Sequence, residues 1–268
     1  MRELSQLIDV DEPAWPEIRE TLEASPVSVE VLPPDSDLGR TTILQLQVTA
    51  RSYLGAMALH CGGLLVDDGW LRVFGSPVRG AAHGVPDLAG VNRFPETFDP
   101  AWQPEAGLVV AQDVLGGVFT LNGAAPADAG RPGSPGEVVY FAPDSLRWEA
   151  LGAGHSAWLT WLLSGALHEF YADLRWPGWQ DEVQELNRSR HRNHASNQDP
   201  DRDPDQDGTS TQGHARGISV FPPLWSAEAR QDLSATSRRA VPMRELLDVA
   251  RDACRQFDGV DPGFLGAA

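Results

Sequence analysis

The 268-residue chain contains no lysine, so arginine supplies all 21 of its basic side chains, against 38 aspartates and glutamates. Its formal net charge at pH 7 is −17. Nucleic acids and anionic membrane surfaces attract proteins through cationic side chains that neutralise phosphates. The scarcity of positive charge therefore predicts that the chain binds neither nucleic acid nor a membrane, and complementary charge makes a basic protein the favoured partner.

Cysteine is scarce as well, and long apolar runs are missing. Cys61 and Cys254 lie far apart and belong to no metal-binding or redox motif, which is typical of a reducing compartment. The N-terminal residues lack the basic segment and apolar core of a secretion signal. The longest apolar stretch, near residues 158–167, is too short and too interrupted to span a bilayer. The sequence therefore predicts a cytoplasmic protein.

Turn chemistry supplies the strongest local signals. Residues 60–75, HCGGLLVDDGWLRVFG, place two apolar runs on either side of Asp68-Gly69, and an Asp-Gly pair in that setting favours a tight β-hairpin. We expect Gly69 to have a positive φ, because the turn requires it. Two more hairpins are predicted, at residues 108–122 around a Gly-Gly pair and at residues 138–151 around a Pro-Asp-Ser turn.

Helical periodicity lies before and after these hairpins. The predicted helical segments are residues 1–25, 35–53, 155–175 and 238–257, and further strands are expected at residues 28–32 and 218–225. Strands grouped between helices are typical of an α+β fold. We therefore predict an α+β fold with a mostly antiparallel sheet of about six strands, on which N-terminal and C-terminal helices pack.

One segment differs in composition from the rest. Residues 187–214 contain a single apolar side chain, Ala195, among polar, charged, Gly and Pro residues. Such a segment buries too little surface to offset the entropy lost on ordering. The sequence therefore predicts a single domain over residues 1–268 with a disordered polar insertion at residues 187–214.

Three motifs carry a resemblance to known families: CGGLLVDDGWLRVFG, GEVVYFAPDSLRWEALGAGHSAWLTWLL and GISVFPPLWS. With these motifs the chain resembles a bacterial family catalogued as domain of unknown function 2625. More distantly it resembles the SUKH (Smi1/Knr4) superfamily of α+β modules, whose members include immunity proteins that bind and neutralise toxin domains. The resemblance implies binding rather than catalysis. It assigns no catalytic residue, and the insertion lies outside both patterns.

The cofactor and metal motifs in the sequence are all incomplete. Residues 152–157, GAGHSA, match a dinucleotide fingerprint, but the following parallel strand is missing. Residues 203–214 resemble the start of a calcium loop, but His214 stands where a bidentate Glu is needed. His191, His194 and His214 could bind a metal only weakly, because no scaffold fixes them. We therefore assign no cofactor, no metal and no catalytic residue.

The candidate binding residues fall into two groups. The first is the acidic turn, Asp67 and Asp68, which turn chemistry alone also explains. The second is a cluster of aromatic and charged side chains around a Pro-Gly pair: Tyr171, Asp173, Arg175, Trp176 and Trp179. Aromatic residues and Arg are enriched at interface hot spots, but a Trp near a helix end often packs in the core, so both interpretations stay open.

These observations favour one function over another. The leading hypothesis is a noncatalytic protein-binding module, with an immunity-like role as a further possibility that the resemblance implies. The alternative is a small-molecule-binding or hydrolytic enzyme whose site is built from loops. An enzyme of this kind should have a deep pocket with convergent polar groups, whereas a binding module should expose an apolar or aromatic patch.

Overall fold

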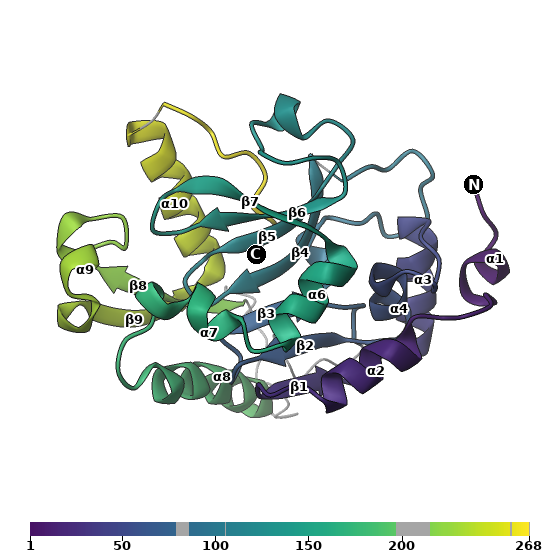
Figure 1. The fold of residues 1–268 in the computed structure, drawn as a ribbon, viewed down its shortest axis with the longest axis horizontal. Helices are drawn as coiled ribbons and strands as arrows, with labels where there is room; N and C mark the ends of the chain where they lie inside the picture. Colours follow the sequence, from purple (N-terminus) through teal and green to yellow (C-terminus); the bar gives the residue numbers. More distant parts are fainter. Residues whose placement is uncertain (79–85, 105, 197–214, 258, 268) are drawn as a thin grey trace, which may run out of the picture.

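The computed structural model describes residues 1–78, 86–104, 106–196, 215–257 and 259–267, with the side chains of residues 189–196 left out. Its main feature is an antiparallel sheet of seven strands whose spatial order follows the sequence (Figure 1). The strands are β1 (Val29–Leu32), β2 (Gly63–Val66), β3 (Leu71–Phe74), β4 (Gly107–Asp113), β5 (Val118–Asn122), β6 (Glu137–Ala142) and β7 (Arg147–Gly154). The predicted α+β class is confirmed, with seven strands in this sheet instead of about six.

All three predicted hairpins form, as β2–β3, β4–β5 and β6–β7. The turn of the first is longer than a two-residue loop, because Val66 pairs with Leu71 and leaves residues 67–70 between the strands. Gly69 has a φ of 86°, which confirms the expected positive value. Asp67 and Asp68 also have positive φ (56° and 59°), a conformation that Asp tolerates better than most residues.

The helices of the N-terminal half pack together with a later one. They are α1 (Leu4–Ile8), α2 (Trp15–Glu23), α3 (Ser36–Leu46) and α4 (Tyr53–His60), and the later one is α6 (His155–Leu163). Contacts join α2, α4 and α6 to one another, and α3 to α1 and α4. The sequence prediction missed α4 because its residues 54–58 are buried in succession, so it has no polar face that would show helical periodicity.

A second sheet holds only two strands, β8 (Arg216–Phe221) and β9 (Ser237–Pro242). The segment expected to be helical from residue 238 therefore begins as a strand, and α10 runs from Met243 to Phe257 and packs against this ribbon. The remaining elements are α5 (Leu88–Val91), η1 (Pro126–Ala129), α7 (Leu167–Phe170), η2 (Ala172–Leu174), α8 (Trp179–Ser196), α9 (Ala227–Gln231) and η3 (Leu233–Ala235). Among the described helices, none is long and apolar enough to cross a membrane.

The segment predicted to be disordered begins inside α8. This helix continues to Ser196, and Asn187 within it donates a hydrogen bond from Nδ2 to the Asp68 carbonyl (2.9 Å). Composition alone did not reveal this tertiary contact, which ties the helix to the first hairpin. Residues 197–214 lie outside the described part of the chain, so the insertion stays a prediction there.

Alanine in place of Gly69 tests the packing of the first turn. A Cβ atom there would overlap the Asn187 side chain, whereas a Cβ at Gly178 would meet nothing within 4 Å, although φ is positive at both glycines (86° and 83°). We expect Gly178→Ala to lower the free energy of unfolding by about 1 kcal/mol through backbone strain, and Gly69→Ala by about 2–3 kcal/mol because the Asn187 hydrogen bond is lost too. Urea unfolding measures both values. Equal losses would show that Asn187 does not hold the turn.

Candidate functional site

The aromatic members of the predicted binding cluster are buried. Tyr171, Trp176 and Trp179 expose only 0%, 2% and 8% of their surfaces. Their rings surround Trp70, whose centroid lies 5.4, 5.9 and 5.0 Å from theirs. The sequence left two interpretations open, an interface or a core position. The structure places these three rings in the core, so they do not form an exposed aromatic patch.

Arg175 brings the cluster and the acidic turn together. Its guanidinium group forms an ion pair with Asp67 of the first turn. The same group lies over the rings of Trp70 and Trp179, 4.9 and 4.2 Å from their centroids. Only 6% of the Arg175 side chain and 19% of the Asp67 side chain is exposed. A partly desolvated cation between aromatic rings and a carboxylate holds its position firmly.

The other two predicted residues take different positions. Asp68 contributes through its backbone, because its carbonyl accepts the hydrogen bond from Asn187. Asp173 lies in η2 and is exposed. The structure therefore unites Asp67, Asp68 and Arg175 with the buried rings and leaves Asp173 at the surface.

A fully buried carboxylate supports the cluster from the sheet. Asp113, at the end of β4, accepts hydrogen bonds at Oδ1 from the backbone N–H groups of Leu115 (2.9 Å) and Gly117 (2.8 Å). Its Oδ2 accepts bonds from the hydroxyls of Tyr140 (2.7 Å) and Tyr171 (3.1 Å). Burial raises the pKa of Asp113, and these bonds to the carboxylate oppose the rise. Both oxygens are thus occupied, and the arrangement fixes the β4–β5 turn and Tyr171.

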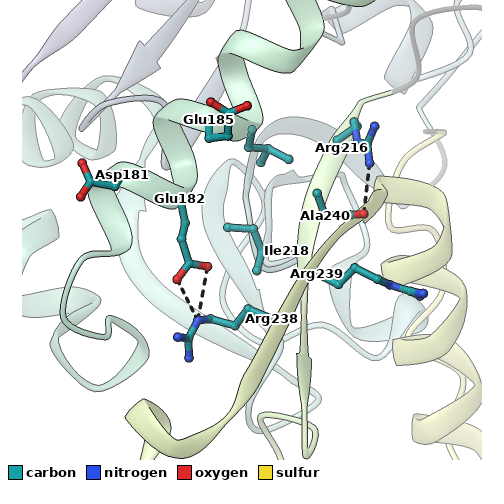
Figure 2. Close-up of a pocket in the computed structure, with 9 residues that line it drawn as sticks. Asp181, Glu182, Glu185, Arg216, Ile218, Arg238, Arg239 and Ala240 are labelled. Atoms are coloured by element: carbon teal, nitrogen blue, oxygen red, sulfur yellow. Dashed lines mark hydrogen bonds and ion pairs between the residues drawn. The ribbon is translucent and has the colours of Figure 1, made fainter.

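Beside the buried cluster lies an open cavity of about 490 Å³, between α8 and the β8–β9 ribbon; we call it the α8–β9 groove (Figure 2). One wall is acidic and the other basic. The residues that line it are Asp181, Glu182, Glu185 and Leu186 of α8, Arg216 and Ile218 of β8, and Arg238, Arg239 and Ala240 of β9. Because antiparallel pairing sets Ile218 opposite Ala240, both strands contribute to one face of the ribbon.

One ion pair links the two walls and joins the groove to the core. Glu182 accepts hydrogen bonds from Arg238 Nε at both of its carboxylate oxygens (3.1 and 3.3 Å) and from Trp176 Nε1 at Oε1 (2.8 Å). The Arg238 guanidinium lies 4.7 Å from the centroid of the Trp176 ring. Trp176 therefore acts as a support beneath the groove, and its indole fixes the carboxylate that faces the groove.

The lining determines what the groove can do chemically. Among the described residues that line it, there is no Ser, Cys, His or Tyr that could serve as a nucleophile or as a base near neutral pH. The carboxylate of Glu182 is already engaged in an ion pair with Arg238. Among the described residues, no group of three His, Cys, Asp or Glu side chains could hold a metal ion. The arrangement suits recognition of a charged ligand.

Sequence reasoning missed this groove because it assigned the start of β9 to a helix. Residues 238–242 contain Arg238 and Arg239, which fit a helix as well as a strand. The available signal was Pro242, because proline favours the first turn of a helix and therefore places the helix start near Met243. The remaining wall, on α8, lies next to the cluster that the sequence did single out.

Comparison with known proteins identifies relatives for most of the chain. A family described as "Protein of unknown function DUF2625" matches residues 4–194. The "Putative uncharacterized protein YbfG" of Escherichia coli (strain K12) is 40% identical over 195 residues, which cover 70% of this chain and 81% of the relative. An "Uncharacterized protein" of Haemophilus influenzae is 29% identical over 187 residues, 70% of this chain and 78% of that one. No solved structure matches the chain.

The family match divides the groove. Asp181, Glu182 and Glu185 of the acidic wall lie within the matched residues, and so does the seven-stranded sheet. Strands β8 and β9 lie beyond residue 194, outside the match. The predicted resemblance to this family is confirmed, whereas the more distant SUKH relation is not shown by these matches.

The burial of Trp176 predicts a large effect on stability. We expect Trp176→Ala to lower the free energy of unfolding by about 3–5 kcal/mol, because it leaves a cavity and removes a hydrogen bond from Glu182. Phe221, which is 70% exposed, provides the control, and Phe221→Ala should change stability by less than about 1 kcal/mol. Chemical denaturation of both variants compares them. A folded Trp176→Ala protein of unchanged stability would contradict the core assignment.

Asp113 predicts a dependence of stability on pH. Because folding raises its pKa above the ordinary value of 3.8, the folded chain holds this proton more tightly than the unfolded chain does. Its contribution to stability is therefore greatest below that value and is lost as the pH rises through the folded pKa. Asparagine does not titrate, so the Asp113→Asn variant lacks this pH-dependent contribution. As the pH rises from about 4 to 7, the free energy of unfolding of the unchanged protein should therefore fall relative to that of the variant. Unfolding free energies across this range test the sign, with Asp128→Asn as an exposed control. If the two unfolding free energies differ by a constant amount across this range, or if the unchanged protein gains stability relative to Asp113→Asn, the predicted sign is wrong.

Proposed function

The chain belongs to the DUF2625 family, and we propose that it is a noncatalytic protein-binding module that takes a basic protein partner in the α8–β9 groove. The observation that supports this most is the acidic wall of α8. Asp181 and Glu185 are exposed there; Glu185 forms an ion pair with Arg188 (3.5 Å), whereas Asp181 has no ion-pair partner in the part of the chain that the structure describes. An accessible carboxylate on a body of net charge −17 attracts a cationic segment.

The arginines of the opposite wall do not cancel this attraction. Arg238 is paired with Glu182, and Arg239 with Glu245 of α10 (3.4 Å). Arg216 donates a hydrogen bond from Nη2 to the Ala240 carbonyl (3.1 Å). Their charges are thus already directed toward groups of the chain itself, and Asp181 is the charged group of the groove that is left to attract a cation.

The character of the groove favours protein binding over small-molecule chemistry. Small-molecule sites are mostly apolar with a few placed polar groups, whereas six of the nine residues that line this groove are charged and only three are apolar. Protein interfaces commonly have charged rims that steer association and select partners. The resemblance of the sequence motifs to the SUKH superfamily, in which immunity proteins bind toxin domains, supports an immunity-like form of the role.

Binding of a defined cationic peptide tests the proposal. We use a peptide of about ten residues in which Lys alternates with Thr, and the same peptide with Glu in place of Lys. We expect the Lys peptide to bind and the Glu peptide not to bind. Asp181→Arg should weaken binding of the Lys peptide by about 1–2 kcal/mol, because an exposed charge of the wall is reversed. Fluorescence anisotropy at low and high salt measures the affinities, and added salt should weaken binding.

A matched variant separates the groove from the overall charge. Glu20 on α2 is exposed and lies outside the groove, and Glu20→Arg changes the net charge by the same amount as Asp181→Arg. We expect Glu20→Arg to bind the Lys peptide nearly as well as the unchanged protein. Equal losses in the two variants, or equal binding of the Lys and Glu peptides, would contradict the proposed docking surface.

A further inference from the structure

The outer edge of β9 carries backbone groups that the ribbon does not use. Ile218 donates its backbone N–H to the Val114 carbonyl (2.7 Å), so this N–H points away from β9. Paired residues of an antiparallel ladder either exchange both of their hydrogen bonds or exchange none. Ile218 pairs with Ala240, so Ala240 also directs its N–H away from β8. The same alternation directs the N–H of Arg238 outward.

These outward groups are available to a ligand. Among the residues that the structure describes, no acceptor bonds to the backbone N–H of Arg238 or of Ala240. Ala240 itself is exposed. The next outward position is Pro242, which has no N–H, and proline is tolerated in a sheet where the N–H would face away from the neighbouring strand. The edge therefore offers two outward N–H groups, while the Ala240 carbonyl beside them already accepts a hydrogen bond from Arg216 Nη2 (3.1 Å).

The acidic wall of α8 lies on one side of this edge. Arg238 and Ala240 line the groove together with Asp181 and Glu185, and Figure 2 shows β9 running past the α8 wall. Successive side chains of a strand point to opposite faces of a sheet. In a strand added beside β9, every second side chain would therefore point to the face of the ribbon that meets α8, where the carboxylates are.

We propose that the basic partner binds by strand addition: an extended segment pairs with the free edge of β9 and directs alternate Lys or Arg side chains toward Asp181 and Glu185. This inference rests on the proposed function and adds how the partner is held. Backbone hydrogen bonds supply attachment, and the acidic wall supplies selectivity. A second copy of the chain fits poorly, because two bodies of net charge −17 repel each other.

N-methylation of the Lys–Thr peptide tests strand addition most sharply. In an extended segment, the N–H groups of alternate residues point to opposite edges, so the Lys and Thr residues present their N–H groups on opposite sides. We prepare one peptide methylated on the Lys nitrogens and one methylated on the Thr nitrogens. Only one of the two sets can face β9. We expect one methylated peptide to lose at least about tenfold in affinity and the other to bind within about threefold of the unmethylated peptide.

A substitution in the protein provides the reciprocal test. Ala240→Pro removes the outward N–H, whereas Ala240→Ser keeps it and changes the side chain by one hydroxyl. We expect Ala240→Pro to weaken binding of the Lys–Thr peptide about tenfold and Ala240→Ser to leave it within about twofold. If Ala240→Pro fails to fold, the methylated peptides with the unchanged protein decide the question.

The outcomes separate the two proposals. If Asp181→Arg weakens peptide binding but both methylated peptides bind equally, strand addition is wrong and the groove recognises side chains alone. If the Lys–Thr peptide does not bind, or if Glu20→Arg weakens it as much as Asp181→Arg, both the inference and the proposed function are overturned. If only one methylated peptide loses binding, and Asp181→Arg weakens binding more than Glu20→Arg does, both strand addition and the proposed function are supported.

Discussion

The ion pair between Arg175 and Asp67 is the contact on which the placement of α8 depends. It joins the segment before α8 to the turn of the first hairpin, and the Arg175 guanidinium packs between the rings of Trp70 and Trp179. Both side chains are largely buried, so neither charge can lose its partner without a cost of several kcal/mol. Such a pair adds modest net stability, but it specifies one geometry, and here it specifies where α8 begins.

The shape of the α8–β9 groove depends on how α8 and the β8–β9 ribbon are attached to the core. Trp179, which packs on Trp70, fixes one end of the acidic wall. The hydrogen bond from Trp176 fixes Glu182 of the same wall. The opposite wall is tied to the main sheet through the bond from Ile218 N–H to the Val114 carbonyl. Because separate parts of the core hold the two walls, the proposed docking of a partner would need little reorganisation of the groove, which reduces its entropic cost.

Local chemistry made part of this structure predictable. The three hairpins depend on turn residues such as Gly69 and Gly116, whose positive φ is a property of a few adjacent residues. The sheet and the α+β class follow from those hairpins. Strand β9 was not predictable in this way, because its pairing with β8 joins residues on either side of α9, and the letters SRRAVP favour no single conformation.

The candidate site was harder to predict than the fold. The sequence drew attention to Arg175, Trp176 and Trp179, but composition could not tell whether the two indole rings face solvent or the core. Their burial depends on Trp70, more than a hundred residues earlier, and on Tyr171, which a hydrogen bond to Asp113 holds in place. In the structure these rings pack in the core, and Trp176 supports the adjacent α8–β9 groove through its hydrogen bond to Glu182.

The central claim is that a basic segment pairs with the outer edge of β9, and amide hydrogen exchange resolved by residue tests it most directly. Saturation with the Lys–Thr peptide should slow exchange at the outward amides of Arg238 and Ala240, while the Arg239 amide, already directed toward β8, stays unchanged. Binding that slows no exchange at Arg238 and Ala240 would contradict the account.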